Sequence, residues 1–326
     1  MNIKKIGITA LAASLVSTSA FAGELTASGS ASLTVENYSG VAQNGGIAYS
    51  MADSVTLGGS TELDNGMTVS MSFELDSDNP SSSSYDNKSM TVSSDAMGTF
   101  KFSGHGGSSA VSAMDATAAG DIFDGFDGKV GTAESGTAAG DAAMLSTAAG
   151  NNSMLYTLPS MVDGLSLSAS YSPQGSNDES SAAFAGTFTG VEGLSVSYGQ
   201  GTNNSAAGTA NDADVTSMKA SYAVGSFTLA YSDHEYDSAS ATRDQDTTSY
   251  SVAYTVTDGI SVSYGTEEMS TGEASTVDAE FSAIVVAYTT GGLTITAKSE
   301  EGENIAYGTG ASEDKDYWGL TLGFAF

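Results

Sequence analysis

Histidine and cysteine, the residues that most often carry catalysis or bind transition metals, are scarce in this chain. The 326-residue sequence has no cysteine and two histidines. A Ser-His-Asp site needs a histidine as its general base, and a zinc site needs several histidine or cysteine ligands. His105 stands in a Gly-His-Gly-Gly stretch and His234 in a Ser-Asp-His-Glu stretch, which we interpret as ordinary loops. The sequence therefore predicts neither an enzyme nor a zinc site.

A run of acidic residues offers the other candidate chemistry. Asp121, Asp124 and Asp127 recur in the stretch Asp-Ile-Phe-Asp-Gly-Phe-Asp-Gly, and Ca²⁺ prefers such oxygen ligands. The run lacks the alternate ligand positions and the bidentate glutamate of an EF-hand loop. We interpret it as a solvated acidic turn without a cofactor and keep calcium as the alternative. Phe123 and Phe126 are expected to attach this turn to a neighbouring wall.

The charge balance of the chain is strongly acidic. Nine lysine and arginine residues stand against 39 aspartate and glutamate residues, for a formal net charge of −30. Such a surface repels nucleic acid, which we exclude as a partner. High charge also occurs in disordered chains, but the regular pattern described below argues against disorder.

The N-terminus has the plan of a secretory signal peptide. Lys4 and Lys5 precede a short apolar stretch over residues 6–16, and Ala-Phe-Ala at residues 20–22 is a typical cleavage site. We therefore expect a signal peptide over residues 1–22. The alternative, a membrane anchor, is disfavoured because the apolar stretch is too short to span a bilayer, and no later stretch predicts a transmembrane helix.

Strict alternation of apolar and small or polar residues is the dominant pattern. It is clearest at the end of the chain, where Trp318, Leu320, Leu322, Phe324 and Phe326 alternate with glycine, threonine and alanine. Successive side chains of a strand point to opposite faces, so this pattern predicts a strand with one apolar face. Turn residues divide the chain into sixteen such strands, at residues 24–37, 53–63, 66–76, 86–94, 98–104, 151–158, 163–172, 180–190, 193–200, 215–223, 225–233, 246–257, 259–267, 278–289, 292–299 and 316–326.

The connections between these strands alternate in length. Seven are short turns, such as Asp64-Asn65, and eight are longer, the longest covering residues 105–150. An even number of strands, with short turns on one side and long loops on the other, is typical of a bacterial outer-membrane barrel. The sequence thus predicts an all-β protein, a sixteen-stranded antiparallel transmembrane β-barrel over residues 23–326.

A soluble β-sandwich or a β-solenoid is the rival architecture, and the placement of charge argues against both. In the clear strands, charged residues have the parity opposite to the apolar residues, as expected if they line a lumen: Glu36, Glu62, Glu74, Lys101, Lys219 and Lys298. Tyrosines recur near strand ends, where amphipathic rings suit the lipid headgroup level: Tyr171, Tyr198, Tyr222, Tyr231, Tyr254, Tyr264 and Tyr288. Sixteen repeats of this pattern favour the barrel.

Three stretches resemble the general porins of Gram-negative bacteria, in particular the sixteen-stranded porins of alpha-proteobacterial type. They are Gly-Thr-Phe-Lys-Phe-Ser-Gly at residues 98–104, residues 151–165 with Pro159, and the terminal strand at residues 317–326. The resemblance implies a passive channel for ions and small hydrophilic solutes in the outer membrane. It also implies contact with lipid and lipopolysaccharide and a homotrimeric assembly. Trp318, Phe324 and Phe326 resemble the signal read by the outer-membrane assembly machinery.

In such porins the longest loop follows the fifth strand, folds into the lumen and narrows it. The resemblance therefore implies a constriction loop over about residues 105–150. Its charged residues are six acids and one base: Asp115, Asp121, Asp124, Asp127, Glu134, Asp141 and Lys129.

One departure from the porin pattern concerns the lumen wall. Many general porins oppose the acidic loop with a cluster of arginines, whereas this chain has a single arginine, Arg243, in a predicted loop. Because acids outnumber bases in the expected constriction loop and on the wall of the first strands, the sequence predicts a preference for cations. Two other functions stay open: a surface protein that uses the barrel as an anchor, and a substrate-specific channel.

Overall fold

A computed structural model describes residues 25–39, 46–76, 87–114, 116–126, 144–145, 151–173, 180–204, 212–274, 276–309 and 313–326. The predicted signal peptide lies outside the described residues, as do five predicted site residues: Asp115, Asp127, Lys129, Glu134 and Asp141. Within the described ranges, no helix has the length and apolar character needed to cross a bilayer.

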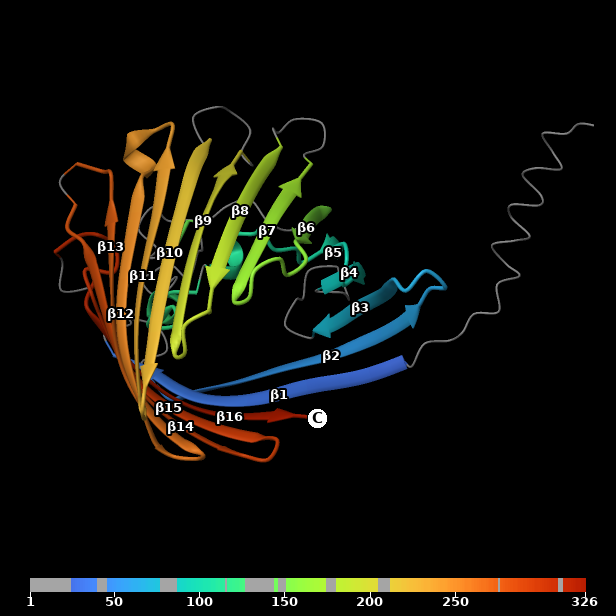
Figure 1. The fold of residues 1–326 in the computed structure, drawn as a ribbon. Coiled ribbons are helices and arrows are strands. Elements are labelled where there is room, and N and C mark those ends of the chain that lie inside the picture. The colour runs from blue at the N-terminus through green and yellow to red at the C-terminus, as the bar shows by residue number, and fades with distance from the viewer. Residues whose placement is uncertain are drawn as a thin grey trace, which may run out of the picture.

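Sixteen antiparallel strands form a closed barrel (Figure 1). They are β1 (Leu25–Tyr38), β2 (Ala48–Glu62), β3 (Thr68–Asp76), β4 (Asn87–Ser94), β5 (Gly98–His105), β6 (Ser153–Thr157), β7 (Leu165–Ser172), β8 (Ser181–Phe188), β9 (Leu194–Asn203), β10 (Ala213–Val224), β11 (Phe227–Ser238), β12 (Gln245–Thr257), β13 (Ile260–Thr271), β14 (Ala279–Thr290), β15 (Leu293–Glu303) and β16 (Lys315–Ala325). Short 3-10 helices are η1 (Ser112–Met114), η2 (Ile122–Phe126) and η4 (Ala241–Arg243). The prediction of sixteen strands is confirmed.

The barrel is closed by its first and last strands. β1 pairs with β16 in the register Leu33↔Leu322, and Figure 1 shows these chain-distant strands side by side. At the end of this seam, the Gly29 N–H donates to the Phe326 carbonyl at 2.9 Å, and the Phe326 N–H donates back at 3.0 Å. Each of the sixteen described strands therefore has a partner on both sides, as a sheet in lipid requires.

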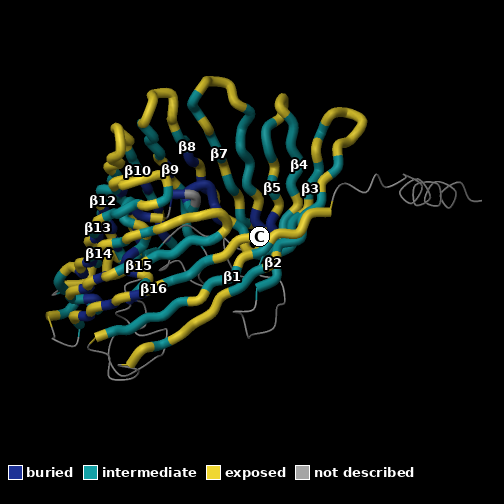
Figure 2. The backbone as a smooth tube through the Cα atoms, turned by 90° about the horizontal axis from the view of Figure 1, so that it is seen from below, coloured by how far each residue is buried: buried dark blue, intermediate teal, exposed yellow. Residues whose placement is uncertain are grey.

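The two faces of the strands differ as the alternation predicts. Trp318 and Phe324 are exposed on the outer side of β16, whereas Lys315 and Tyr317 at the alternate positions are buried on the inner side. Figure 2 shows exposed, intermediate and buried positions alternating along the strands. The apolar face therefore points outward, which rules out the β-sandwich, whose apolar faces lie inside.

Aromatic pairs mark two levels of the outer surface. Phe227 and Tyr254 pair at 4.8 Å between ring centroids near one end of β11 and β12, and Tyr231 pairs with Tyr250 at 5.1 Å further along. Leu229 and Val252 lie opposite each other between the two pairs. Aromatic rings flanking an apolar band are typical of the two membrane interfaces.

Several strands continue past their predicted ends on the long-loop side. β11 extends to Ser238 instead of residue 233, β13 to Thr271 instead of 267 and β15 to Glu303 instead of 299. The alternation continues there, but with acids such as Asp233 and Glu235 at outward positions, so these residues read as loops. The interpretation of His234 as a loop residue was therefore wrong: it lies on β11, is buried and faces inward.

Candidate functional site

The segment that follows β5 contacts the inward-facing side chains of distant strands. The N–H groups of Ala118 and Ala119 donate to the hydroxyls of Ser232 on β11 and Ser249 on β12, at 2.8 and 2.9 Å. The Ser251 hydroxyl donates to the Ala118 carbonyl at 2.6 Å. Serines at alternating inward positions thus satisfy the backbone of a segment that has no sheet partner of its own.

Two apolar clusters accompany these hydrogen bonds. The first, here called the η1 cluster, joins Val111 and Met114 to small residues of β8 and to Val215 of β10. Because Ala183 and Ala185 carry minimal side chains at inward positions of β8, η1 can approach the wall closely. The remaining members of the η1 cluster are Ala110, Ala213 and Tyr236, with Leu145 and Leu155 packed against it.

The second cluster, the η2 cluster, surrounds the acidic turn predicted from the sequence. Phe123 and Phe126 are buried, and the Phe126 ring lies 5.6 Å from that of Phe281 on β14. The expectation that these two phenylalanines attach the turn to a wall is confirmed. The other members of the η2 cluster are Ile122, Met269, Ala279, Ala283, Ile305, Tyr307 and Tyr317.

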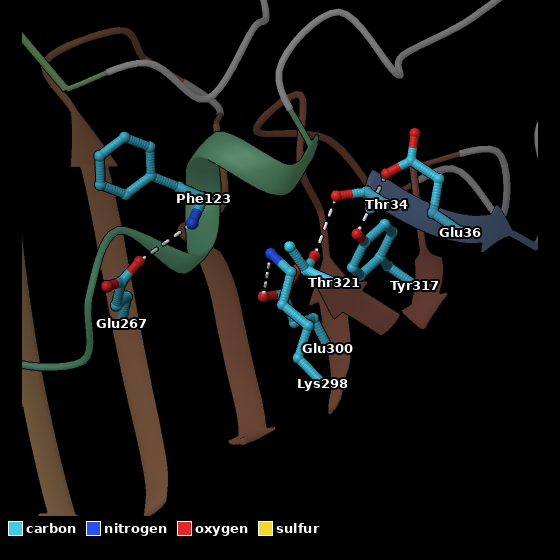
Figure 3. A network of polar contacts seen from close by, with 8 residues as sticks. All are labelled: Thr34, Glu36, Phe123, Glu267, Lys298, Glu300, Tyr317 and Thr321. Carbon is cyan, nitrogen blue, oxygen red and sulfur yellow. Dashed lines mark hydrogen bonds and ion pairs between the residues drawn. The ribbon is translucent and has the colours of Figure 1, made fainter. Parts of the chain in front are cut away.

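A buried carboxylate fixes the start of η2. Glu267 on β13 accepts a hydrogen bond from the Phe123 N–H at 3.0 Å (Figure 3). It accepts a second from the Thr117 hydroxyl. Burying a carboxylate is costly unless it is hydrogen-bonded, so the two donors account for its stability here. The sequence analysis did not single out Glu267, although its parity, opposite to that of Val262 and Tyr264, was the available signal.

The two described acids of the acidic turn differ in their surroundings. Asp121 has a positive φ of 57° and accepts a hydrogen bond from the Thr117 N–H at 2.7 Å, so it closes the turn before η2. Asp124 is exposed. Among the described residues, no three acidic or histidine side chains are grouped to hold a metal ion.

Two of the predicted wall lysines are engaged on the inner side. Lys219 of β10 donates from Nζ to the carbonyls of Ala116 and Thr117, at 2.6 and 3.1 Å. Lys298 of β15 forms an ion pair with Glu300 at 2.9 Å, and its ammonium lies 4.8 Å from the centre of the Tyr317 ring. The third, Lys101, lies on β5 opposite Leu155.

The predicted wall acids lie on β1 to β3, and Glu36 shares a stretch of wall with Lys298, since both lie opposite Gly319 of β16. Glu36 accepts a hydrogen bond from the Tyr317 hydroxyl at 3.1 Å (Figure 3), and Glu74 accepts one from the Asn87 amide at 2.6 Å. Both donors are neutral, so these contacts leave the negative charge in place. Glu62 is exposed at the end of β2, beside a short turn.

The returning limb of the segment, at residues 144–145, is held by two side chains that sequence reasoning missed. The Leu145 carbonyl accepts from His234 Nε2 at 2.6 Å, and the Leu145 N–H donates to Gln245 Oε1 at 2.7 Å. With Nε2–H donating, His234 Nδ1 accepts from the Ser217 hydroxyl. His234 thus positions backbone and has no access to a substrate.

A closed sixteen-stranded barrel that is apolar outside and polar inside is a transmembrane β-barrel of the outer-membrane type. The chain belongs to the Gram-negative porin family, whose model matches residues 7–326. It is accordingly a channel protein of the outer membrane and not an enzyme. No curated protein sequence matches the chain.

Solved porin structures share the fold at low sequence identity. An anion-selective porin from Comamonas acidovorans is 17% identical, with a TM-score of 0.70, over 93% of this chain and 99% of that one. OmpT of Vibrio cholerae in its trimer form is 16% identical, with a TM-score of 0.67, over 94% and 100% of the two chains. A mutant of the Rhodopseudomonas blastica porin is 14% identical, with a TM-score of 0.64, over 93% and 100%.

Proposed function

We propose that this porin is a cation-preferring diffusion channel for ions and small hydrophilic solutes, narrowed by the segment of about residues 105–150. The support for the narrowing is the set of hydrogen bonds between residues 116–126 and inward-facing side chains. A segment held against the inner wall reduces the open cross-section, so solutes are sieved by size and biased by fixed charge. The channel performs no chemistry on them.

The balance of charge along the inner wall carries the cation preference. Lys298 is offset by the carboxylate of Glu300, whereas Lys219 keeps its positive charge, because its ammonium is bound by two neutral carbonyl oxygens. Glu36 and Glu74 receive neutral donors only in the hydrogen bonds described above. The field at the wall formed by β1 to β3 is therefore negative and concentrates cations. The acids Asp121 and Asp124 add negative charge to the constriction segment itself.

The fold of the porin family does not decide selectivity, because a solved neighbour of this barrel is anion-selective. At 17% identity that neighbour shares the backbone and few of its side chains. Selectivity then depends on which charges this chain places along the ion path.

Assembly and targeting are part of the same proposal. We infer a homotrimer, by analogy with the trimer form of the Vibrio cholerae protein. The apolar outer face and its aromatic pairs suit contact with lipid and lipopolysaccharide. Residues 1–22 are proposed to be removed on export, and Trp318, Phe324 and Phe326 to be read by the assembly machinery. The mass of the purified protein checks the first point and crosslinking of the native protein checks the trimer.

The experiment that tests the function is conductance of the purified protein in a planar bilayer, with a KCl gradient. A zero-current potential of the sign for cation flow supports the proposal, and one of the opposite sign at low salt overturns the preference. An adhesin that uses the barrel only as an anchor gives no conductance. A substrate-specific channel is recognised by block of the current by one solute at low concentration.

A further inference from the structure

The loop between β15 and β16 folds inward onto η2. Ile305 has no exposed surface, and Tyr307 is 9% exposed; both belong to the η2 cluster beside Phe126. They stand outside the strands, on the long-loop side of the barrel, where an ordinary surface loop carries polar residues. A buried isoleucine and tyrosine in such a loop indicate that it is docked on the segment below it.

Hydrogen bonds hold this docked loop together and attach it to two other segments, through Val277 and Gln245. The Tyr307 N–H donates to the Asn304 carbonyl at 2.7 Å, and the Tyr307 carbonyl accepts from the Val277 N–H at 3.1 Å. The Ile305 N–H donates to the Glu313 carbonyl at 3.1 Å. The Tyr307 hydroxyl accepts from Gln245 Nε2 at 3.3 Å. Burial raises the pKa of Tyr307, which keeps this hydroxyl neutral.

Gln245 connects the docked loop to the returning limb of the constriction segment. Its amide nitrogen donates to the Tyr307 hydroxyl, and its carbonyl oxygen accepts from the Leu145 N–H. Ile305 meanwhile packs in the cluster around η2. The docked loop therefore contacts the outgoing limb of the segment through Ile305 and the returning limb through Gln245.

Backbone strain is confined to the two segments that meet here. Among the described residues, four non-glycine residues have a positive φ, and all four lie in these two loops: Asp121 and Asn152 after β5, and Asn304 and Tyr307 after β15. A positive φ is uncommon for a bulky residue such as tyrosine. Such a strained conformation persists only where the surrounding contacts over-determine it. The docked conformation is thus specifically held.

Gly302 on β15 shows how close the approach is. A Cβ added at this position would lie 2.8 Å from Ile305 Cγ2 and 3.3 Å from Phe126 Cδ1. The absence of a side chain at position 302 therefore lets Ile305 and the ring of η2 meet over the strand. Any larger residue at position 302 would push the docked loop and η2 apart.

We propose that residues 304–309 form a latch that holds both limbs of the constriction segment against the wall, so that the width and steadiness of the pore are set by two loops together. This inference rests on the proposed channel function, with the segment after β5 as the constriction. The latch is a positioning element. Releasing it lets residues 116–126 fluctuate in the ion path.

The test compares Ile305→Ala and Gly302→Val with Ile47→Ala in the full-length protein. Ile47 is 59% exposed and serves as the matched control for truncating an isoleucine. Single-channel recordings measure open-channel noise and the voltage of closure, and hydrogen exchange measures protection of the peptide 116–126. We expect the channels formed by Ile305→Ala and by Gly302→Val to show more open-channel noise and to close at a lower voltage. Hydrogen exchange of the peptide 116–126 should be at least about tenfold faster in these two variants than in the unmodified protein. Truncating a buried isoleucine costs enough free energy to shift a local opening equilibrium by more than tenfold.

Tyr307→Phe removes a single hydrogen bond without emptying the cluster, so it folds even if the other two variants do not. It should show a smaller change in the same direction. Exchange and recordings equal to those of the unmodified protein, in variants that fold, would overturn the latch. A failure of the unmodified protein to conduct would refute the channel function instead, and the exchange measurement would still decide the latch.

Discussion

Glu267 and Phe123 are 144 residues apart in the chain and are joined by a hydrogen bond of 3.0 Å, from the Phe123 N–H to Glu267 Oε2. The same carboxylate binds the Thr117 hydroxyl. One side chain of β13 therefore fixes both the turn that begins at Thr117 and the first residues of η2. This contact couples the barrel wall to the constriction segment at the level of single atoms.

Replacing this carboxylate by an amide tests the coupling. Glu267→Gln keeps the shape but offers one acceptor oxygen for two donors, so one donor is left unsatisfied, at a cost of about 1–3 kcal/mol. We expect faster hydrogen exchange of the Phe123 N–H and little change in the barrel strands. Glu268→Gln, which makes the same change on the outward side of β13, is the control. Equal exchange in the two variants would mean that the clusters, and not Glu267, hold η2.

Deletion of residues 115–141 tests whether the segment narrows the pore. The segment occupies lumen cross-section, so its removal is expected to raise single-channel conductance in a barrel that still closes through β1 and β16. Retention of the barrel is checked by heat-modifiable migration on gels. An unchanged conductance in a folded deletion variant would place the constriction elsewhere.

The outward face of β12 provides a test of membrane placement. Val252 lies opposite Leu229, between the two aromatic pairs, and Ala253 is its neighbour on the inner side. A lysine near the midplane of the lipid face costs about 2–4 kcal/mol, whereas a lysine in the lumen stays in water. We therefore expect Val252→Lys to lower the free energy of unfolding in lipid by this amount and Ala253→Lys to change it little, as measured by denaturant titration.

The last residue of the chain is expected to be needed for assembly. Deleting Phe326 removes both backbone hydrogen bonds to Gly29 at the seam between β1 and β16, and unpaired backbone in lipid is costly. Phe326→Ala keeps the backbone and removes the ring. We expect a lower yield of folded barrel from both, with the larger loss for the deletion, and no loss for the outward-facing control Phe188→Ala. A normal yield from the deletion would contradict a role in assembly.

The sequence predicted the strands because the alternation is a local property. Val262 and Tyr264, for example, are two residues apart, and the lipid face requires both to be apolar. The strand ends on the long-loop side were missed because outward positions there, such as Asp233 and Glu235, lie beyond the apolar band and carry charge. Strand geometry continues there although the hydrophobic signal stops.

The contacts of the constriction segment were not predictable in the same way. His234 meets Leu145, and Gln245 meets both Leu145 and Tyr307, across 62 to 100 residues of chain. These pairings depend on which strands stand opposite each other around the barrel. Ile305 also stood in a stretch rich in glycine and acids that reads as a surface loop. Burial of a single side chain in such a stretch cannot be predicted from the sequence, because the residues around it follow no alternating pattern.

Measurements of ion selectivity can distinguish the effect of charges inside the pore from that of charges on the outside of the barrel. The double variant Glu36→Gln with Glu74→Gln neutralises two inward acids, and Asp233→Asn with Glu235→Gln neutralises two outward acids of β11. The change in formal charge is the same for both pairs. A comparison between them therefore depends on position alone.

Ionic strength then distinguishes the two positions. Screening acts over about 10 Å at 0.1 M salt and about 3 Å at 1 M, so outward acids act on the ion path only at low salt, whereas lumen acids act at both. We expect the inward pair to reduce the cation preference at 0.1 M and at 1 M, and the outward pair to reduce it slightly at 0.1 M only. The measurement is the zero-current potential at both salt levels. A larger effect of the outward pair would show that cations are selected at the external mouth and that the acids on β1 and β3 do not border the ion path.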